Sequence, residues 1–306
     1  MKWWEKPGHQ PILVTGAVRS GTTFVGKVLA ETEGAIYVSE PFNIHNKKVY
    51  DTNWENQWTY LTDADKPAYY KKLCNAFKLE AVAKSPLSLN GIRAFLHDMA
   101  LSFVGSPERV IIKDPIALAS TNFIHKHFNA KVVLCVRHPA GFVQSMQKLN
   151  WLADPNYFLN QPALVERYLS SIKAELEAYK HVTEPNIEVN ALGWKAQNLI
   201  VKQLLDENSS FILLKHEKLS NNPIETFKDL LDELKLPLTS DLELFIKNHT
   251  SSNNPEQTSS NQPHTIKLNA KANSQGWKKK LTSHEISTIK AITEPVASYF
   301  YNETEW

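Results

Sequence analysis

The chain has 306 residues, of which 42% are hydrophobic and 22% charged, and its formal net charge is +2. This composition is typical of a soluble globular protein, and the length allows one large α/β domain or two small ones. The near-neutral charge gives no support for a protein that binds nucleic acid or a membrane surface through bulk charge.

The N-terminal segment 1–10 is polar and lacks the apolar core of a signal peptide. The chain also contains no apolar run of about 20 residues. We therefore expect no membrane span and a cytoplasmic location. The two cysteines, Cys74 and Cys135, are too few for a disulfide framework and stand in no metal-binding pattern.

Short runs of β-branched and apolar residues alternate with helical patterns along the chain. The apolar runs predict strands at 11–16, 35–39, 109–113, 131–136 and 210–217. Helices are expected at 21–32, 91–104, 117–128, 139–150, 162–180, 192–208, 222–235 and 283–299. The alternation predicts an α/β fold, a P-loop-like three-layer sandwich with a central parallel sheet flanked by helices and with ligands at the carboxyl ends of the strands.

Two segments do not follow this alternation. Residues 42–90 are rich in aromatic side chains without a clean period and predict an irregular insertion over the sheet. Residues 248–276 are polar with little helix or strand signal, which is typical of a lid or a disordered loop; we extend this lid to residue 280. Because no repeat or low-complexity linker divides the chain, we expect a single domain over residues 1–306.

The segment VTGAVRSGTTF follows the first expected strand and opens the first expected helix. Backbone N–H groups in such a turn and the positive end of a helix hold an anion. An ATP-binding loop would carry a lysine directly after Gly21, where this chain has Thr22, and its cation Arg19 lies inside the turn. No convincing acidic partner for Mg²⁺ follows on a later strand. The loop thus predicts a site for a smaller, metal-free phosphate group, and the alternative is a tight glycine turn without a ligand.

A second candidate phosphate site follows the fourth expected strand, in the segment RHPAGFVQS. Arg137 directly follows the strand, Pro139 suits the first position of a helix, and Ser145 lies about two helical turns into that helix. A guanidinium fork and a hydroxyl that converge on one group suit a second phosphate. The alternative is that Arg137 is a solvated surface residue.

Together with LLKHEKLSNNPIETFKDLLDELKLP and GWKKKLT, these two motifs resemble the sulfotransferases that use 3′-phosphoadenylyl sulfate (PAPS). The resemblance covers residues 11–300 and is strongest to the carbohydrate, tyrosylprotein and bacterial branch. It implies that the first loop holds the 5′-phosphosulfate and that Arg137 and Ser145 hold the 3′-phosphate. The loop residues concerned are Arg19, Ser20, Gly21, Thr22 and Thr23.

The resemblance also assigns the chemistry to two strand ends. Glu40 follows the second strand, and a carboxylate there would take the proton of an acceptor hydroxyl as it attacks sulfur. Lys113 ends the third strand, where an ammonium would stabilise the negative charge that develops during sulfuryl transfer. Alternatively, Asp114 acts as the base or orients Lys113. Glu40 and Lys113 could also have structural roles only.

In the family a late segment closes on the bound nucleotide. By this resemblance Lys271, Ser274 and Trp277 are candidate cofactor-binding residues, although the extra residue Gly276 leaves their register open. Elsewhere we interpret Glu217 as structural and expect His138 to point away from the site. Aromatic residues such as Trp58 and Trp151 either stack on a sugar or pack in the core.

The sequence therefore predicts a PAPS-dependent sulfotransferase that needs no metal and transfers a sulfonate group to a hydroxyl by in-line displacement. The acceptor is expected to be a small molecule, a lipid or a glycan, and the insertion at 42–90 is expected to line its pocket. No nucleic acid is expected as a partner. The alternatives are an ATP-dependent P-loop kinase or other phosphoryl transferase, and a non-catalytic nucleotide-binding module. The sequence does not indicate the oligomeric state.

Overall fold

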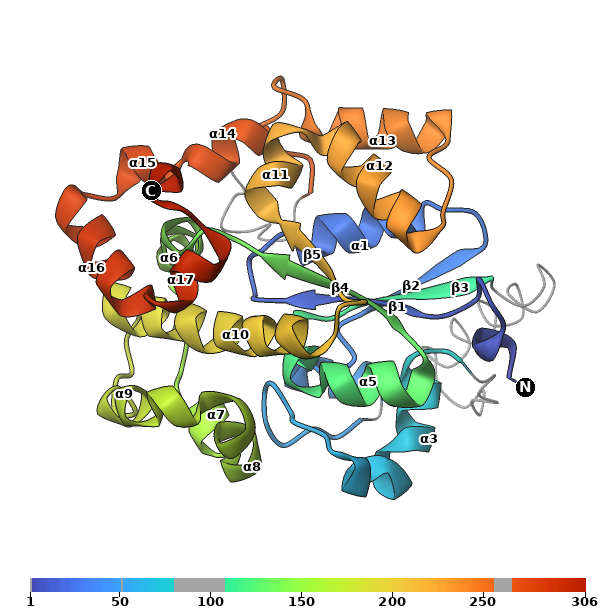
Figure 1. Cartoon of the computed structure of the whole chain (residues 1–306), viewed down its shortest axis with the longest axis horizontal. Coiled ribbons are helices and arrows are strands. Elements are labelled where there is room, and N and C mark those ends of the chain that lie inside the picture. Colours follow the sequence, from blue (N-terminus) through green and yellow to red (C-terminus); the bar gives the residue numbers. More distant parts are fainter. Residues whose placement is uncertain (1, 51, 80–107, 256–265) are drawn as a thin grey trace.

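Figure 1 presents a computed structural model of the protein, which describes residues 2–50, 52–79, 108–255 and 266–306. Its centre is a sheet of five parallel strands in the order β2-β3-β1-β4-β5. The strands are β1 (Ile12–Gly16), β2 (Ala35–Ser39), β3 (Arg109–Lys113), β4 (Lys131–Val136) and β5 (Ile212–Lys215). The five expected strands and the parallel sheet are confirmed.

Successive residues of each strand point to opposite faces of the sheet, and each face is buried. Leu13 packs into one hydrophobic cluster with Val110, whereas its neighbours Ile12 and Val14 pack into another. Cys135 lies fully buried in this second cluster, and burial raises the pKa of its thiol to about 12. This explains why the strands read as continuous apolar runs rather than as an alternating pattern.

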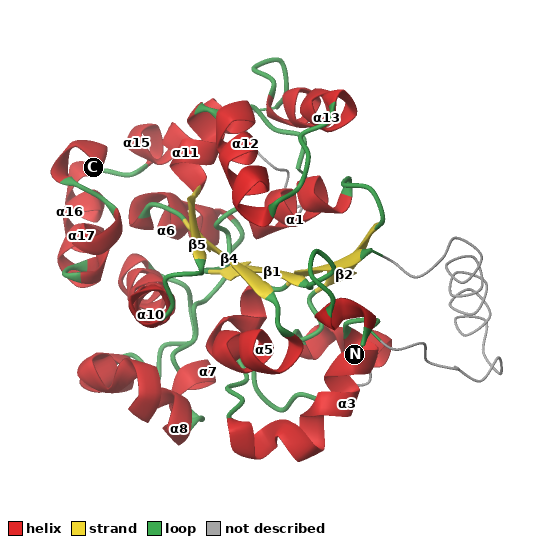
Figure 2. Ribbon diagram, turned by 45° about the vertical axis from the view of Figure 1, so that its right-hand side comes forward, coloured by secondary structure: helices red, strands yellow, loops and turns green. Residues whose placement is uncertain are grey.

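Helices cover both faces, so the three-layer sandwich is also confirmed (Figure 2). One face carries α1 (Thr22–Ala30), α12 (Pro223–Leu234) and α13 (Ser240–Thr250), and the other carries α3 (Lys66–Ala76), α5 (Thr121–Phe128) and α10 (Ile187–Glu207). Further helices lie around the carboxyl ends of β4 and β5 (Figure 1). These are α6 (Pro139–Lys148), α11 (His216–Asn221), α14 (Ala270–Gln275), α15 (Trp277–Lys280), α16 (Ser283–Thr293) and α17 (Val296–Phe300).

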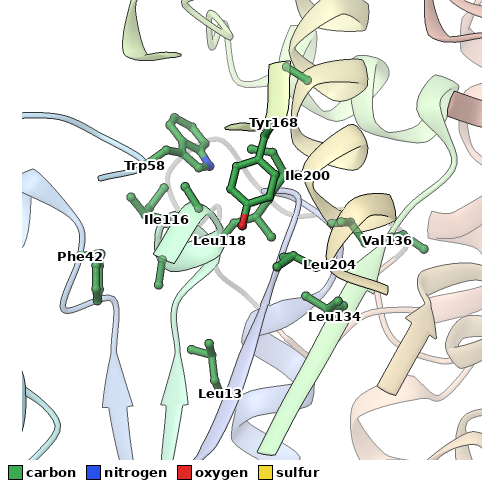
Figure 3. Close-up of a cluster of buried hydrophobic side chains, with 14 of the residues drawn as sticks. Leu13, Phe42, Trp58, Ile116, Leu118, Leu134, Val136, Tyr168, Ile200 and Leu204 are labelled. Carbon is green, nitrogen blue, oxygen red and sulfur yellow. The ribbon is translucent and has the colours of Figure 1, made fainter. Parts of the chain in front are cut away.

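The larger hydrophobic cluster fills the space between the sheet and the lower helical layer in Figure 1. Figure 3 shows part of it, with Leu13 and Leu134 from the sheet facing Ile200 and Leu204 of α10. Trp58 lies beside Ile116, beyond the ends of β2 and β3. The core therefore extends past the strand ends and supports one side of the region in which a ligand is expected.

Several predicted helices differ from the observed ones. The helix expected at 117–128 begins as a 3-10 helix, Pro115–Ser120, because the Asp114 side chain accepts hydrogen bonds from the first backbone N–H groups and Pro115 follows it. The helix expected at 162–180 is divided into α8 (Pro162–Leu164), a π-helical segment (Val165–Leu169), a 3-10 turn (Ser170–Ile172) and α9 (Lys173–Ala178). The helix at 283–299 is interrupted at Pro295, which cannot continue the hydrogen-bonded ladder.

The two segments predicted to be irregular contain helices. The insertion includes the short α2 (Lys47–Tyr50) and α3, and its residues 80–90 lie outside the described chain, as does the helix expected at 91–104. In the segment expected to be a lid, α13 continues to Thr250 and α14 begins at Ala270. Asn269 caps α14 by accepting a hydrogen bond from the Ala272 N–H at 3.1 Å, a local signal that a polar composition obscures.

The end of β1 depends on a glycine. Gly16 has φ +130°, and a Cβ placed on it would lie 2.1 Å from the carbonyl oxygen of Cys135 on the neighbouring strand β4. We predict that Gly16→Ala lowers the free energy of unfolding by about 3 kcal/mol or more, because either the strand pairing or the turn must shift. Urea unfolding measures this difference.

Gly276→Ala is the matched control. Gly276 has φ −60°, and a Cβ there would meet its nearest neighbours at an ordinary 3.5 Å. We expect its unfolding free energy to change by no more than about 0.5 kcal/mol. Equal stability of the two variants would contradict the proposed constraint at the end of β1.

Candidate active site

A cavity of about 670 Å³ opens at the carboxyl ends of the strands. Its wall is formed by the turn after β1, the start of α1, the segment after β2, α6 and the residues that follow it, α11, and the end of α13 with the approach to α14. The sequence-predicted residues on this wall are Arg19, Gly21, Thr22, Thr23, Glu40, Arg137 and Ser145. The structure thus brings together residues that are more than 100 positions apart in the sequence.

The turn between β1 and α1 presents an uncapped helix N-terminus to the cavity. Gly21 is the N-cap of α1, has φ +92° and offers no side chain to cap the first turn. The first N–H groups of a helix have no partner within the helix, and the helix dipole makes this end positive. The turn is held in place by α10, because the Val18 N–H donates to Oε1 of Gln197 at 2.9 Å. The Ser20 hydroxyl instead donates to the Ala17 carbonyl, away from the cavity wall.

Arg137 is the most constrained cation of the site. Only 5% of its surface is exposed, and its carbonyl accepts a hydrogen bond from Nε1 of Trp194 at 2.8 Å. The guanidinium donates to the Arg19 carbonyl at 3.2 Å and, at 3.5 Å, to Oδ1 of Asn273. Its Nε is buried without a hydrogen-bond partner, and among the described residues its counter-charge is Glu217, which lies beyond ion-pair distance. Since a buried cation is costly without a counter-charge, the site is suited to an anion.

Arg19 lies next to Arg137. Its Nε donates to the Ser145 hydroxyl at 3.1 Å, and its guanidinium lies 5.5 Å from the ring centre of Trp151. Burial, together with the neighbouring charge of Arg137, lowers the pKa of Arg19 to about 10. Arg19 also has φ +62°, an unusual backbone conformation for a residue other than glycine. The Arg19 side chain, which belongs to the first predicted phosphate loop, thereby reaches Ser145 of the second predicted phosphate site.

Glu40 and Lys113 form an ion pair at the ends of β2 and β3. Lys113 Nζ lies 2.5 Å from Oε1 of Glu40, and Oε2 of Glu40 accepts a hydrogen bond from the Asn43 amide at 2.7 Å. The pairing follows from the sheet, because the Glu40 N–H donates to the Lys113 carbonyl at 2.8 Å as a continuation of the ladder. Glu40 has φ +55° and lines the cavity, whereas Lys113 is buried behind it.

Asp114, the alternative base, is turned away from the cavity. Its carboxylate accepts hydrogen bonds from the backbone N–H of Phe42 at 2.6 Å and of Ile116 at 2.9 Å. Burial raises the pKa of Asp114 to about 7, against the lowering effect of these N–H donors. The carboxylate holds the segment after β2 against the turn after β3, so its contacts are those of a structural residue.

The lid residues that the family resemblance indicates do not line the cavity. Lys271 is exposed, and the buried Ser274 hydroxyl donates to the Lys271 carbonyl at 2.9 Å. The Trp277 ring stacks on His138, with centroids 4.7 Å apart and planes at 4°. Instead Asn273 lies on the wall and contacts Arg137. The structure therefore places the residue before Ser274, rather than Ser274 itself, at the cavity.

Glu217 and His138 lie directly behind Arg137. Glu217 accepts hydrogen bonds from the His138 N–H and from the Tyr301 hydroxyl, each at 3.0 Å. Burial alone would raise the pKa of Glu217, but the interactions with His216, the His138 N–H and Arg137 outweigh it and lower the pKa to about 2. His138 faces the aromatic rings of Trp277 and Tyr301 rather than the cavity, in agreement with the sequence-based expectation.

Sequence analysis missed three residues that shape the site: His216, Gln197 and Asn273. His216 lines the cavity directly after β5, so the rule that strand ends converge would have identified it. Gln197 lies in the middle of α10, and Asn273 directly precedes Ser274, a candidate from the family resemblance. For these two, no local pattern in the sequence marks the contact.

The described residues contain neither a metal-binding cluster nor a membrane-spanning helix. In residues 2–50, 52–79, 108–255 and 266–306, no group of three or more His, Cys, Asp or Glu side chains could hold a metal ion. Within the same ranges, no helix has both the length and the apolar character needed to cross a bilayer.

Comparison with known proteins identifies the class. A model of the sulfotransferase family matches residues 11–241. Among solved structures, the chain is similar to a sulfotransferase domain from the curacin biosynthetic pathway, with a TM-score of 0.51 and 15% identity over 95% of this chain and 97% of that one.

Two further sulfotransferase structures are more distant. STF9 from Mycobacterium avium has a TM-score of 0.43 and 14% identity over 91% of this chain and 77% of that one. Mouse SULT7A1, solved with PAP, has a TM-score of 0.42 and 11% identity over 95% and 87%. No curated protein sequence matches the chain. Since the family model covers most of the chain, the protein belongs to the sulfotransferase family.

The burial of His138 makes the free energy of unfolding depend on pH. Burial lowers its pKa from 6.5 to about 4, although the nearby Glu217 opposes the shift. The unfolded chain therefore binds more protons between these two values, and the folded state loses stability as the pH falls from 6.5 towards 4. From pH 7 to pH 5 we expect this residue to contribute a loss of about 2 kcal/mol.

Urea unfolding of His138→Asn at pH 7 and pH 5 checks this expectation. Nδ1 of His138 accepts a hydrogen bond from the Ala140 N–H at the start of α6, and asparagine keeps a short acceptor there. The informative quantity is the change of the unfolding free energy with pH, rather than the difference between the variant and the wild type at one pH. His181→Asn, at an exposed position, is the control and should behave like the wild type. The expectation fails if His138→Asn loses as much stability between the two pH values as the wild type does.

Proposed function

We propose that this sulfotransferase uses PAPS as donor and transfers its sulfonate group to a hydroxyl of a small-molecule, lipid or glycan acceptor. The observation that carries the donor assignment is the buried guanidinium of Arg137, which lacks an ion pair in the described chain and lies beside Ser145 and Arg19 on the cavity wall. This is a ready site for a phosphate separate from the one at the α1 N-terminus.

The two anionic ends of the donor have separate binding groups in this proposal. The N–H groups at the start of α1, with the hydroxyls of Thr22 and Thr23, hold the 5′-phosphosulfate. Arg137 and Ser145 hold the 3′-phosphate through charge-assisted hydrogen bonds. The hydrogen bond between Arg19 and Ser145 supports a link between the two sites, in which Arg19 turns towards the sulfonate when the 3′-phosphate takes over Ser145.

Transfer then proceeds by in-line displacement. Glu40 accepts the proton of the acceptor hydroxyl while the oxygen forms a bond to sulfur. The bond between sulfur and the bridging phosphate oxygen breaks, and adenosine 3′,5′-bisphosphate leaves with the electron pair. Lys113, Arg19 and the α1 N-terminus stabilise the charge on the sulfonate oxygens and the leaving oxygen. The contact between Lys113 and Glu40 supports this arrangement, since it keeps the ammonium next to the reacting groups.

We assign the acceptor to the side of the cavity formed by the insertion, and we treat residues 1–306 as one catalytic unit. Asn43, Gln57 and Trp58 of the insertion line the cavity on the side of Glu40. The nucleotide side is formed by α11 and by the segment before α14. Asn273, rather than the family-derived candidates Ser274 and Trp277, contacts the donor in this proposal, and Lys271 is exposed to solvent.

The rival functions are less consistent with the site. A kinase that uses ATP and Mg²⁺ needs a lysine at the phosphates, and Thr22 stands in its place. A non-catalytic nucleotide-binding module would not need a carboxylate on the cavity wall with an ammonium paired behind it, as Glu40 and Lys113 are. Transfer of labelled sulfonate from PAPS to any acceptor separates our proposal from both.

We predict that Glu40→Gln lowers kcat by about 10²-fold or more, because the amide cannot accept the acceptor proton. Its affinity for adenosine 3′,5′-bisphosphate should stay near that of the wild type, since Glu40 does not contact the donor phosphates in this proposal. Sulfonate transfer from radiolabelled PAPS measures the first quantity, and calorimetry the second.

Glu31→Gln, which makes the same chemical change at an exposed position after α1, is the control and should keep full activity. A Glu40→Gln enzyme with near-normal turnover would remove Glu40 from the mechanism. An inactive variant that also fails to bind the nucleotide would show that the substitution disturbs the fold of the site.

A further inference from the structure

The cavity has two chemically different sides, which lie on opposite faces of the sheet. Leu219 and Ser220 of α11, the end of α13 and the segment before α14 line it above the sheet in Figure 1. Trp58, Ile116 and Tyr157 also line it; Tyr157 belongs to α7 (Asn156–Leu159), which lies below the sheet in Figure 1. The turn after β1 lies between them. Glu40 lies at the strand ends on the cavity wall and accepts a hydrogen bond from Asn43 of the insertion, so we assign the acceptor to the second side.

The acceptor side is built from a continuous apolar surface. Trp58 lies beside Ile116 (Figure 3), and its ring is 5.8 Å from that of Tyr157, which also lines the cavity. Gln161 fixes this arrangement, because its amide donates to the carbonyls of Gln57 and Trp58 at 3.1 and 3.3 Å. Met146 and Trp151 also line the cavity, and Trp151 is 38% exposed.

The polar groups beside Glu40 are used within the protein. The Asn43 amide donates to Glu40, and its Oδ1 accepts a hydrogen bond from the His45 N–H at 3.0 Å. Oε1 of Gln57 and Nε1 of Trp58 have no hydrogen-bond partner, but both atoms are buried away from the cavity surface. A sugar buries many hydroxyls, and each one that lacks a partner costs free energy. The apolar surface offers hydrogen-bond partners to few of these hydroxyls.

The charged groups of the site argue against a charged acceptor. Glu40 is neutralised by Lys113, and the other charged groups at the border with the donor side are the cations Arg19 and Lys148. Burial raises the pKa of Tyr157, so its phenol stays uncharged. An amine acceptor would lie beside these cations without a free carboxylate. An anionic acceptor would have to lie against the same apolar wall.

Space limits the size of the acceptor. The whole cavity of about 670 Å³ is within the range of about 300–1,000 Å³ that is usual for a single drug-sized ligand. It must hold the nucleotide as well as the acceptor. The part of the acceptor that enters is therefore small.

We propose that the acceptor is a small, uncharged, predominantly apolar alcohol or phenol, which lies against Trp58, Ile116 and Tyr157 with its single hydroxyl at Glu40. This inference rests on the proposed sulfonate transfer, and it names the substrate class of the same site. Trp58 and Tyr157 act as specificity-determining residues: they recognise the apolar body, while Glu40 and Asn43 receive the hydroxyl.

The test is a binding measurement on the full chain saturated with adenosine 3′,5′-bisphosphate. The probes are 2-naphthol and methyl β-D-glucopyranoside, each titrated by calorimetry. We expect 2-naphthol to bind at least about tenfold more tightly, because aromatic contacts and apolar burial favour it. Equal or tighter binding of the glucoside would overturn the inference. Failure of adenosine 3′,5′-bisphosphate itself to bind would instead overturn the proposed function.

Tyr157 offers a matched pair of variants at a half-buried position that is less critical to folding than the buried Trp58. Tyr157→Ala should weaken 2-naphthol binding by about tenfold, whereas Tyr157→Phe, which keeps the ring, should bind it like the wild type. Neither should change the affinity for adenosine 3′,5′-bisphosphate. If the two variants bind 2-naphthol equally well, the ring lies elsewhere and the inference is wrong.

Discussion

The burial of Arg137 is the constraint on which the site depends. A guanidinium taken out of water must be held by hydrogen bonds and balanced by negative charge. Here Trp194 fixes its backbone, the Arg19 carbonyl and Asn273 accept from its fork, and Glu217 lies behind it as a more distant counter-charge. These contacts come from α10, the first loop, α14 and α11, so one buried cation unites four separate parts of the chain.

The same constraint explains why the C-terminal region is part of the site. Glu217 is kept ionised by its hydrogen-bond donors, and one of these is the hydroxyl of Tyr301. His138, the residue next to Arg137, is enclosed by Trp277, Tyr301 and Trp306. Trp277 of α15 and the segment after α17 therefore cover the back of the arginine, and they contribute to the site through packing rather than through direct contact with the cavity.

Most of the fold and the principal candidates could be predicted from the sequence because both follow from local patterns. Each strand is a short apolar run, and the carboxyl end of each strand marks a position at the site, as for Glu40 and Arg137. Contacts that depend on the path of the chain could not be predicted. The orientation of Asp114 away from the cavity, the contact of Asn273 with Arg137 and the hydrogen bond between Arg19 and Ser145 are set by tertiary packing. The division of the helix at 162–180 has the same origin, since no proline or glycine marks it from within.

Calorimetric titration with adenosine 3′,5′-bisphosphate and with 5′-AMP tests the central claim most directly, because the two nucleotides differ only in the 3′-phosphate assigned to Arg137. We expect the bisphosphate to bind about 30-fold more tightly or better, as a charge-assisted contact with a buried arginine would provide, and we expect Arg137→Ala to abolish this difference. Arg167→Ala, which removes a surface arginine paired with Glu207, should leave it unchanged. Equal affinities for the two nucleotides in the wild type, or tighter binding of ATP with Mg²⁺, would contradict the account.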